Sequence, residues 1–287
     1  MTTRPLHVAR AGSGPALVLV HGYLGGSSQW AAEMQALSPQ LDVIAPDLPG
    51  FGKSQHLVSP DQISGHALAV LDALDGLGVQ RFHLLGHSMG GMVVQEMVRL
   101  APQRVERLVL YATGPLGLLP GRFETMARSR ERLREEGVQA TARRISATWL
   151  REREASPSAR MLGDLAAQAS AQAAEAGLWA MERWDGRAHL GQIRQPTLII
   201  WGDQDRSYQW AQIEALWRGI RETLQVSINL GGAKFEQNLY GQGGRFDAVQ
   251  LLIGYKEGQP CPACGAIIAK IQTGSTAGFI CPSCQTL

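Results

Sequence analysis

This 287-residue sequence has little net charge and no long apolar run. Its 27 basic and 25 acidic residues leave a formal charge of +2, which gives no electrostatic argument that the whole chain binds nucleic acid or membranes. No apolar run approaches the ~18 residues needed to cross a bilayer, and the first residues lack the apolar stretch of a signal peptide. With 45% hydrophobic residues the composition is globular, and we expect a cytoplasmic protein.

Histidine and cysteine are each absent from one part of the chain. All seven histidines precede residue 190, and all four cysteines follow residue 260. This asymmetry indicates two unrelated segments. After about residue 219 glycine becomes frequent and polar turn signals crowd together, so we expect one domain at 1–218 and a second segment at 219–287.

Short β-rich apolar runs alternate with longer helical patterns over residues 1–114. They predict strands at 16–20, 41–45, 82–85 and 105–111, and helices at 29–36, 62–77 and 88–101. The strand pattern resumes at 196–202. Strands separated by helices imply right-handed crossovers, so the expected fold class is α/β, with a doubly wound, mostly parallel sheet covered on both faces.

Between about 115 and 190 the strand signal is absent, and Ala, Arg, Glu and Met predominate. The stretch 122–154 holds nine arginines and six acids. A stripe that binds nucleic acid is one interpretation, but the interspersed acids favour a solvated helical face with ion pairs. Because an all-helical insertion between two strands suits a lid over a site, we expect a helical lid here.

The segment 86–90 reads Gly-His-Ser-Met-Gly and fits the pattern G-x-S-x-G, directly after a predicted strand and before a predicted helix. A sharp strand-to-helix turn exposes the serine hydroxyl, and it requires glycines because a Cβ would clash with neighbouring backbone. We therefore expect Ser88 to be a catalytic nucleophile. A glycine turn follows the strand at 16–20, where the N–H of Tyr23 would form an oxyanion hole with that of Met89.

Residues 1 to about 218 resemble the α/β-hydrolase family, in the lidded branch that includes carboxylesterases, lactonases and hydrolases of carbon–carbon bonds. Four motifs stand in the family's order: Val-His-Gly at 20–22, Asp-Leu-Pro-Gly-Phe-Gly-Lys-Ser at 47–54, Gly-His-Ser-Met-Gly-Gly at 86–91 and Pro-Thr-Leu-Ile-Ile-Trp-Gly-Asp-Gln-Asp at 196–205. The resemblance implies Ser88 as nucleophile and an acid in the loop after the last strand. The family's Gly-x-x-Asp spacing selects Asp205 and leaves Asp203 as a residue that caps its own turn.

The resemblance implies a triad in the order Ser, Asp, His, but no histidine follows His189. Lys234 is the nearest titratable side chain where the histidine would fall, and it could act as a base only if burial lowered its pKa by several units. His21 and His87 flank the expected site and offer another route, although their motifs favour packing or loop hydrogen bonds. We expect a hydrolase scaffold whose hydrolysis is severely impaired.

The four cysteines form two C-x2-C pairs separated by 16 residues, Cys261 with Cys264 and Cys281 with Cys284. Four thiolates at this spacing complete a tetrahedral shell, which predicts a structural Zn²⁺ site and not a catalytic one. Two disulfides or four free thiols are the alternatives, and the expected cytoplasmic setting disfavours disulfides.

Residues from about 219 to 287 resemble the C-terminal zinc finger of the formamidopyrimidine-DNA glycosylase and endonuclease VIII family, on the segments 238–244, 258–265 and 280–285. The resemblance implies a β-hairpin between the cysteine pairs that contacts DNA through a basic residue. The stretch 273–278 has no basic residue, and no stretch matches that family's N-terminal catalytic part. With five basic and four acidic residues from 219 on, we expect weak or no binding to nucleic acid and no base excision.

The sequence thus predicts a serine hydrolase scaffold for an ester, lactone or activated carbon–carbon bond of a small molecule, followed by a zinc ribbon. The alternative is a zinc-dependent module that binds nucleic acid, carried on an inactive scaffold. A third interpretation is a fusion of two segments without a joint function. Because the family's last strand has no counterpart, an exposed sheet edge and self-association are further hypotheses.

Overall fold

The structure, a computed structural model, describes residues 5–119, 122, 124–229, 257–261, 265–273 and 276–280. Side chains are described in these ranges except at 221–229 and 271–280. The chain divides into two compact units, Met1–Ile220 and Arg221–Leu287. No helix in the described ranges is long and apolar enough to span a membrane.

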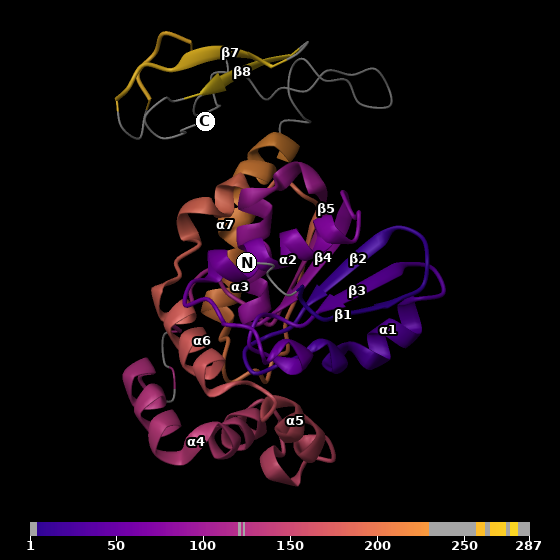
Figure 1. Ribbon diagram of the computed structural model, residues 1–287. Coiled ribbons are helices and arrows are strands. Elements are labelled where there is room, and N and C mark those ends of the chain that lie inside the picture. Colours follow the sequence, from indigo (N-terminus) through magenta and orange to yellow (C-terminus); the bar gives the residue numbers. More distant parts are fainter. Residues whose placement is uncertain are drawn as a thin grey trace. The chain divides into compact units, whose positions relative to one another are not determined.

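A six-stranded sheet forms the centre of the first unit (Figure 1). Its strands are β1 (Val8–Ala11), β2 (Ala16–Val20), β3 (Asp42–Pro46), β4 (Phe82–His87), β5 (Val105–Tyr111) and β6 (Thr197–Ile200), in the order β1-β3-β2-β4-β5-β6. All neighbouring strands run parallel except β1, which pairs antiparallel with β3. The sheet confirms the expected α/β class, since buried parallel strands read as nearly continuous apolar runs.

Helices follow most strands and cover the sheet. They are α1 (Ala31–Leu37), α2 (Ile63–Gly76), α3 (Met89–Leu100), α4 (Met126–Thr148), α5 (Ala159–Ala166), α6 (Ala171–Arg183) and α7 (Trp210–Asn229). Leu17 and Leu19 of β2 belong to a core cluster against which Met34 and Leu37 of α1 pack. Val18 points to the opposite face, because successive side chains of a strand alternate, and it is fully buried. Burial of such a side chain stabilises the fold by ~1.5–3 kcal/mol.

Strand β6 lies at one edge of the sheet, next to β5. Leu198 and Ile200 of β6 are 56% and 42% exposed, and no further strand pairs with β6 among the residues that the structure describes. Within the described ranges β6 is therefore an edge strand that exposes apolar side chains.

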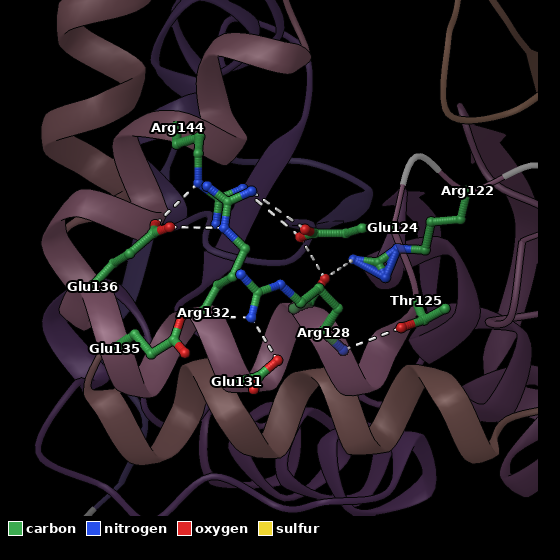
Figure 2. A network of polar contacts seen from close by, with 10 residues as sticks. Arg122, Glu124, Thr125, Arg128, Glu131, Arg132, Glu135, Glu136 and Arg144 are labelled. Atoms are coloured by element: carbon green, nitrogen blue, oxygen red, sulfur yellow. Dashed lines mark hydrogen bonds and ion pairs between the residues drawn. The ribbon is translucent and has the colours of Figure 1, made fainter.

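The segment between β5 and β6 contains α4, α5 and α6, and its described residues form no strand beyond one bridge between Leu116 and Asp185. Helix α4 is kinked at Gly137, whose φ is +77°. Ion pairs hold the two halves of α4 together, as Glu136 contacts Arg132 before the kink at 2.7 Å and Arg144 after it at 3.1 Å (Figure 2). The arginine-rich stretch is thus a face laced with ion pairs, as its interspersed acids favour.

The second unit contains an antiparallel hairpin of β7 (Ala269–Thr273) and β8 (Thr276–Ile280). A tight turn precedes the hairpin, in which the N–H of Cys261 donates to the carbonyl of Ala266 and the N–H of Gly265 donates to the carbonyl of Cys261, both at 2.8 Å. Gly265 has a φ of +77°, which glycine adopts without strain. The hairpin lies between the two cysteine pairs in sequence; the zinc ribbon and the assignment of domains to 1–218 and 219–287 stay predictions.

Candidate active site

Ser88 lies where β4 turns directly into α3. Its backbone has φ 53° and ψ −119°, a conformation that costs free energy in any residue with a Cβ. A Cβ added at Gly86 would lie 2.3 Å from the carbonyl oxygen of Gly90, and one added at Gly90 would lie 2.3 Å from that of Val20. Because only glycine fits at both positions, the local sequence permits the sharp turn that raises the Ser88 hydroxyl out of the sheet.

Tyr23 and Met89, whose amides are the expected oxyanion donors, lie close to Ser88: Tyr23 lines the same pocket, and Met89 follows the serine in the chain. A Cβ at Gly22 would lie 3.1 Å from the Cβ of Ser88, so the loop after β2 runs beside the serine. Met89 begins α3, and the first N–H groups of a helix have no partner within it. Among the described residues no hydrogen bond uses the N–H of Tyr23 or of Met89. Both amides are available to an anion, which the N-terminus of a helix also favours.

Asp205 lies in the loop between β6 and α7. Its Oδ1 accepts hydrogen bonds from the N–H of Ser207 at 2.7 Å and of Tyr208 at 3.1 Å. The carboxylate therefore closes its own loop, a turn-capping role that the sequence assigns to Asp203. Within the described part of the chain no hydrogen bond joins Asp205 to a histidine.

A pocket of about 560 Å³ lies over Ser88. The helical segment between β5 and β6 contributes Trp149 and Met181 to its wall, and the loop after β6 contributes Asp205. Arg122 also lines the pocket. Burial lowers the pKa of its guanidinium, which donates to the hydroxyl of Ser129 at 3.1 Å. The volume and the mixed lining suit a small molecule.

Both ring nitrogens of His21 are occupied by the fold. Its Nδ1 donates to the carbonyl of Gly22 at 2.8 Å, and its Nε2 accepts from the N–H of Leu48 at 2.9 Å. The ring is completely buried, and this burial lowers its pKa. The ring of His21 thus holds the neighbouring loops through hydrogen bonds to their backbone, and neither nitrogen is free to act as a base.

His87 lines the pocket but its ring packs against Tyr111, with ring centroids 5.0 Å apart. Burial lowers its pKa to about 4, so the imidazole is neutral at neutral pH. None of the described histidines forms a hydrogen bond with the hydroxyl of Ser88. Lys234, the other candidate base, lies outside the described residues.

Tyr208 lines the same pocket as Ser88. Its side chain is 3% exposed. Burial raises the pKa of this phenol to about 12. Sequence reasoning missed Tyr208, because no spacing rule links this position in the loop to the serine; only the folded loop brings them together.

Of the four predicted zinc ligands, Cys261 alone lies among the described residues; Cys264, Cys281 and Cys284 lie outside them. The thiol of Cys261 is buried beside Ile268. The backbone N–H of Gly265, a left-handed glycine, donates to the carbonyl of Cys261 at 2.8 Å and closes a turn directly after this cysteine.

The sheet order and the turn at Ser88 are those of an α/β hydrolase. Residues 15–232 match the family model described as alpha/beta hydrolase fold, and the chain belongs to this family. Residues 258–287 match the model of the zinc finger found in FPG and IleRS. The two matches agree with the two resemblances drawn from the sequence.

Curated proteins and solved structures match the chain over about two thirds to three quarters of its length. The dihydrolipoyllysine-residue acetyltransferase component of an acetoin cleaving system from Pseudomonas putida is 36% identical over 197 residues, 67% of this chain and 52% of that protein. The 2-hydroxy-6-oxo-6-phenylhexa-2,4-dienoate hydrolase of Comamonas testosteroni is 30% identical over 216 residues, 70% of this chain and 75% of that one. The crystal structure of the enol-lactonase from Burkholderia xenovorans LB400 matches with a TM-score of 0.68 and 25% identity, over 75% of this chain and 84% of that one. The chain spans between half and two thirds of the length of several curated relatives that it matches.

Proposed function

We propose that this protein is a serine hydrolase of the α/β-hydrolase type that acts on an ester, a lactone or an activated carbon–carbon bond of a small molecule, with severely impaired hydrolysis. Ser88 is the nucleophile, and the N–H groups of Tyr23 and Met89 hold the oxyanion. The observation that carries the proposal is the strained backbone of Ser88 at the floor of a pocket of about 560 Å³. Two similar proteins are named as a hydrolase and an enol-lactonase, which is chemistry of the same kind.

The impairment follows from the missing imidazole. In a complete triad a histidine takes the proton of the serine, and the aspartate orients that histidine. Here Asp205 caps its own loop, His21 has both nitrogens engaged, and His87 packs against Tyr111. Loss of the base from a serine hydrolase lowers turnover by about 10⁶, or roughly 8 kcal/mol of barrier, which leaves the contributions of the oxyanion hole and of binding.

Acylation of the full-length protein by p-nitrophenyl acetate tests this proposal. Intact-protein mass and peptide mapping report how fast and where an acetyl group is attached. We expect slow attachment to Ser88, absent in Ser88→Ala and unchanged in Ser38→Ala, which removes a serine hydroxyl at the end of α1. Acetyl groups on surface lysines with none on Ser88 would contradict the assignment of the nucleophile.

A zinc-dependent module that binds nucleic acid is a second candidate, favoured by the zinc-finger match at 258–287 and by the turn at Cys261. In this proposal Cys261, Cys264, Cys281 and Cys284 hold one Zn²⁺, which stabilises the fold of the segment and takes no part in catalysis. The hydrolase unit would then be an inactive scaffold.

Filter binding to DNA and RNA over a salt series separates the two candidates. Affinity that falls steeply with salt and disappears in Cys264→Ser would support the second candidate, because phosphate contacts release counterions. Retention that is negligible or insensitive to this substitution would exclude it. We expect the latter from the near balance of charge beyond residue 219.

A further inference from the structure

The peptide unit that joins Gly22 to Tyr23 carries the N–H expected to hold the oxyanion, and its orientation is fixed at the carbonyl end. The carbonyl of Gly22 accepts hydrogen bonds from the Nδ1 of His21 at 2.8 Å and from the N–H of Gly25 at 3.0 Å. Because a trans peptide unit is planar, its N–H points away from this carbonyl. Two hydrogen bonds to Gly22 therefore set the direction of the N–H of Tyr23.

The turn that contains Tyr23 has a backbone conformation that the surrounding structure must hold. The next residue, Leu24, has a φ of +57°, in the left-handed region. This conformation costs free energy in a residue with a Cβ, and it persists only where neighbouring groups over-determine it. The side chain of Leu24 is buried, and the side chain of Tyr23 supplies a second anchor.

The side chain of Tyr23 reaches helix α6. Its hydroxyl donates to the backbone carbonyl of Ala174 at 2.7 Å, in a contact that is buried. A Cβ added at Gly177, nearly one helical turn further on, would lie 2.9 Å from the Cδ2 and Cε2 atoms of the Tyr23 ring. The ring also packs edge-on against that of Phe51, with centroids 6.2 Å apart. Helix α6 thus has a glycine where the ring of Tyr23 lies and an acceptor where its hydroxyl ends.

Helix α6 is itself fixed to another loop of the sheet, so it can serve as an anchor. The N–H of Ser170, directly before the helix, donates to the carbonyl of Gly50 at 3.0 Å. The side-chain amide of Gln172 donates to the carbonyl of Ser59 at 2.9 Å and accepts from its N–H at 2.8 Å. These bonds join α6 to the loop after β3. The bond from Tyr23 therefore ties the turn after β2 to a helix whose position is also set by other contacts.

We propose that the side chain of Tyr23 is a positioning group, which anchors the turn after β2 to α6 and so keeps its own N–H directed at the carbonyl oxygen of a substrate that reacts with Ser88. Oxyanion donors contribute most when they are in place before charge develops, because no reorganisation is then required. The hydroxyl acts through the backbone, since it is buried against the carbonyl of Ala174. Burial also raises the pKa of this phenol, which keeps its proton for this bond. Docking of α6 thereby sets the strength of the oxyanion hole.

The inference rests on the proposed nucleophile and oxyanion hole, and a pair of esters tests it separately. Ser88 of the full-length protein is acylated by p-nitrophenyl acetate and by the matching thiono ester, in which sulfur replaces the carbonyl oxygen, and mass spectrometry follows both rates. Sulfur accepts hydrogen bonds from N–H groups more weakly than oxygen, so the thiono ester gains less from an oxyanion hole. The ratio of the oxygen-ester rate to the thiono-ester rate therefore reports on the oxyanion donors, and a loss of folded protein does not change it.

Two variants weaken the contact between Tyr23 and α6 in different ways. Tyr23→Phe keeps the ring and the N–H but removes the donor to Ala174. Gly177→Ala keeps the hydroxyl but places a Cβ 2.9 Å from the ring. Ser146→Ala is the matched control, because it removes a buried hydroxyl of α4 that also donates to a backbone carbonyl, that of Arg143 at 3.1 Å.

We expect Tyr23→Phe to lower the ratio about tenfold, less than the ~10²–10³ that loss of a whole oxyanion donor costs, because the N–H remains but is no longer held. Gly177→Ala lowers the ratio in the same direction, and Ser146→Ala leaves it unchanged. Equal losses with both esters in Tyr23→Phe would indicate a merely structural role and overturn the inference. Wild-type rates with both esters in Tyr23→Phe would also overturn it and leave the proposed hydrolase standing. No acylation of Ser88 in the wild type would overturn both.

Discussion

Replacement of Gly90 by alanine is expected to destabilise the first unit although it introduces a better helix former. The Cβ of the introduced alanine would lie 2.3 Å from the carbonyl oxygen of Val20 and 2.4 Å from that of His21, both backbone atoms that cannot turn away. Forcing an extra carbon into such a space costs ~1–3 kcal/mol, against a gain in helix propensity of at most ~1 kcal/mol. A net loss of up to ~2 kcal/mol lowers the midpoint of thermal unfolding by roughly 4–8 °C in a domain of this size.

Intrinsic tryptophan fluorescence is the assay, because all seven tryptophans lie between residues 30 and 217 and report on the first unit. Gly76→Ala is the matched control: Gly76 ends helix α2 and has no atom within 4 Å of an added Cβ. We expect its midpoint to stay or to rise slightly. If Gly90→Ala unfolded at or above the midpoint of Gly76→Ala, the steric account of the turn at Ser88 would be refuted.

The remaining predictions concern pH, association and metal. Burial lowers the pKa of His66 and His87 to about 4, so the unfolded chain binds protons that the native chain does not between pH ~6.5 and 4. The free energy of unfolding should therefore be constant above pH ~7. Below pH ~6.5 it should fall by up to ~1.4 kcal/mol per pH unit for each histidine. Equal midpoints of urea unfolding at pH 7 and pH 5 would contradict this. The exposed sheet edge at Leu198 should make the protein self-associate. Light scattering should therefore give a larger mass for the wild type than for Leu198→Lys. A monomeric wild type would argue against association. Elemental analysis should find one zinc per chain, lost in Cys281→Ser; a chain purified without zinc at neutral pH would speak against the four-thiolate site.

The inner strands could be predicted from the sequence because their physical signal is strong. The observed β2 and β5 coincide with the predicted 16–20 and 105–111, since both are apolar runs buried by helices. The sequence does not predict strand β1. This strand has only four residues and lies at the edge of the sheet. One of them is Arg10, whose guanidinium pairs with Asp42 at 2.7 Å, so the strand shows neither an apolar run nor a regular alternation of apolar and polar residues.

The candidate site, like the sheet, could be predicted from the sequence only in part. Ser88 could be predicted because its backbone needs glycines at fixed offsets, which leaves a local pattern in the sequence. The loop-closing role of Asp205 and the burial of Tyr208 in the pocket of Ser88 depend on how one loop folds, and such an arrangement leaves no local pattern. The absence of histidine after His189 remains the clearest functional signal in the sequence, and none of the described histidines is hydrogen-bonded to the hydroxyl of Ser88.

The central claim is that the missing imidazole, and not a defective pocket, limits this hydrolase. The most direct test is the steady-state turnover of p-nitrophenyl acetate by the full-length protein beside Ser88→Ala at neutral pH. A typical enzyme turns over at ~10 s⁻¹, and loss of the base costs about 10⁶. We predict a Ser88-dependent kcat on the order of 10⁻⁵ s⁻¹ on this reasoning. A kcat on the order of 1 s⁻¹ or more that disappears in Ser88→Ala would contradict the account.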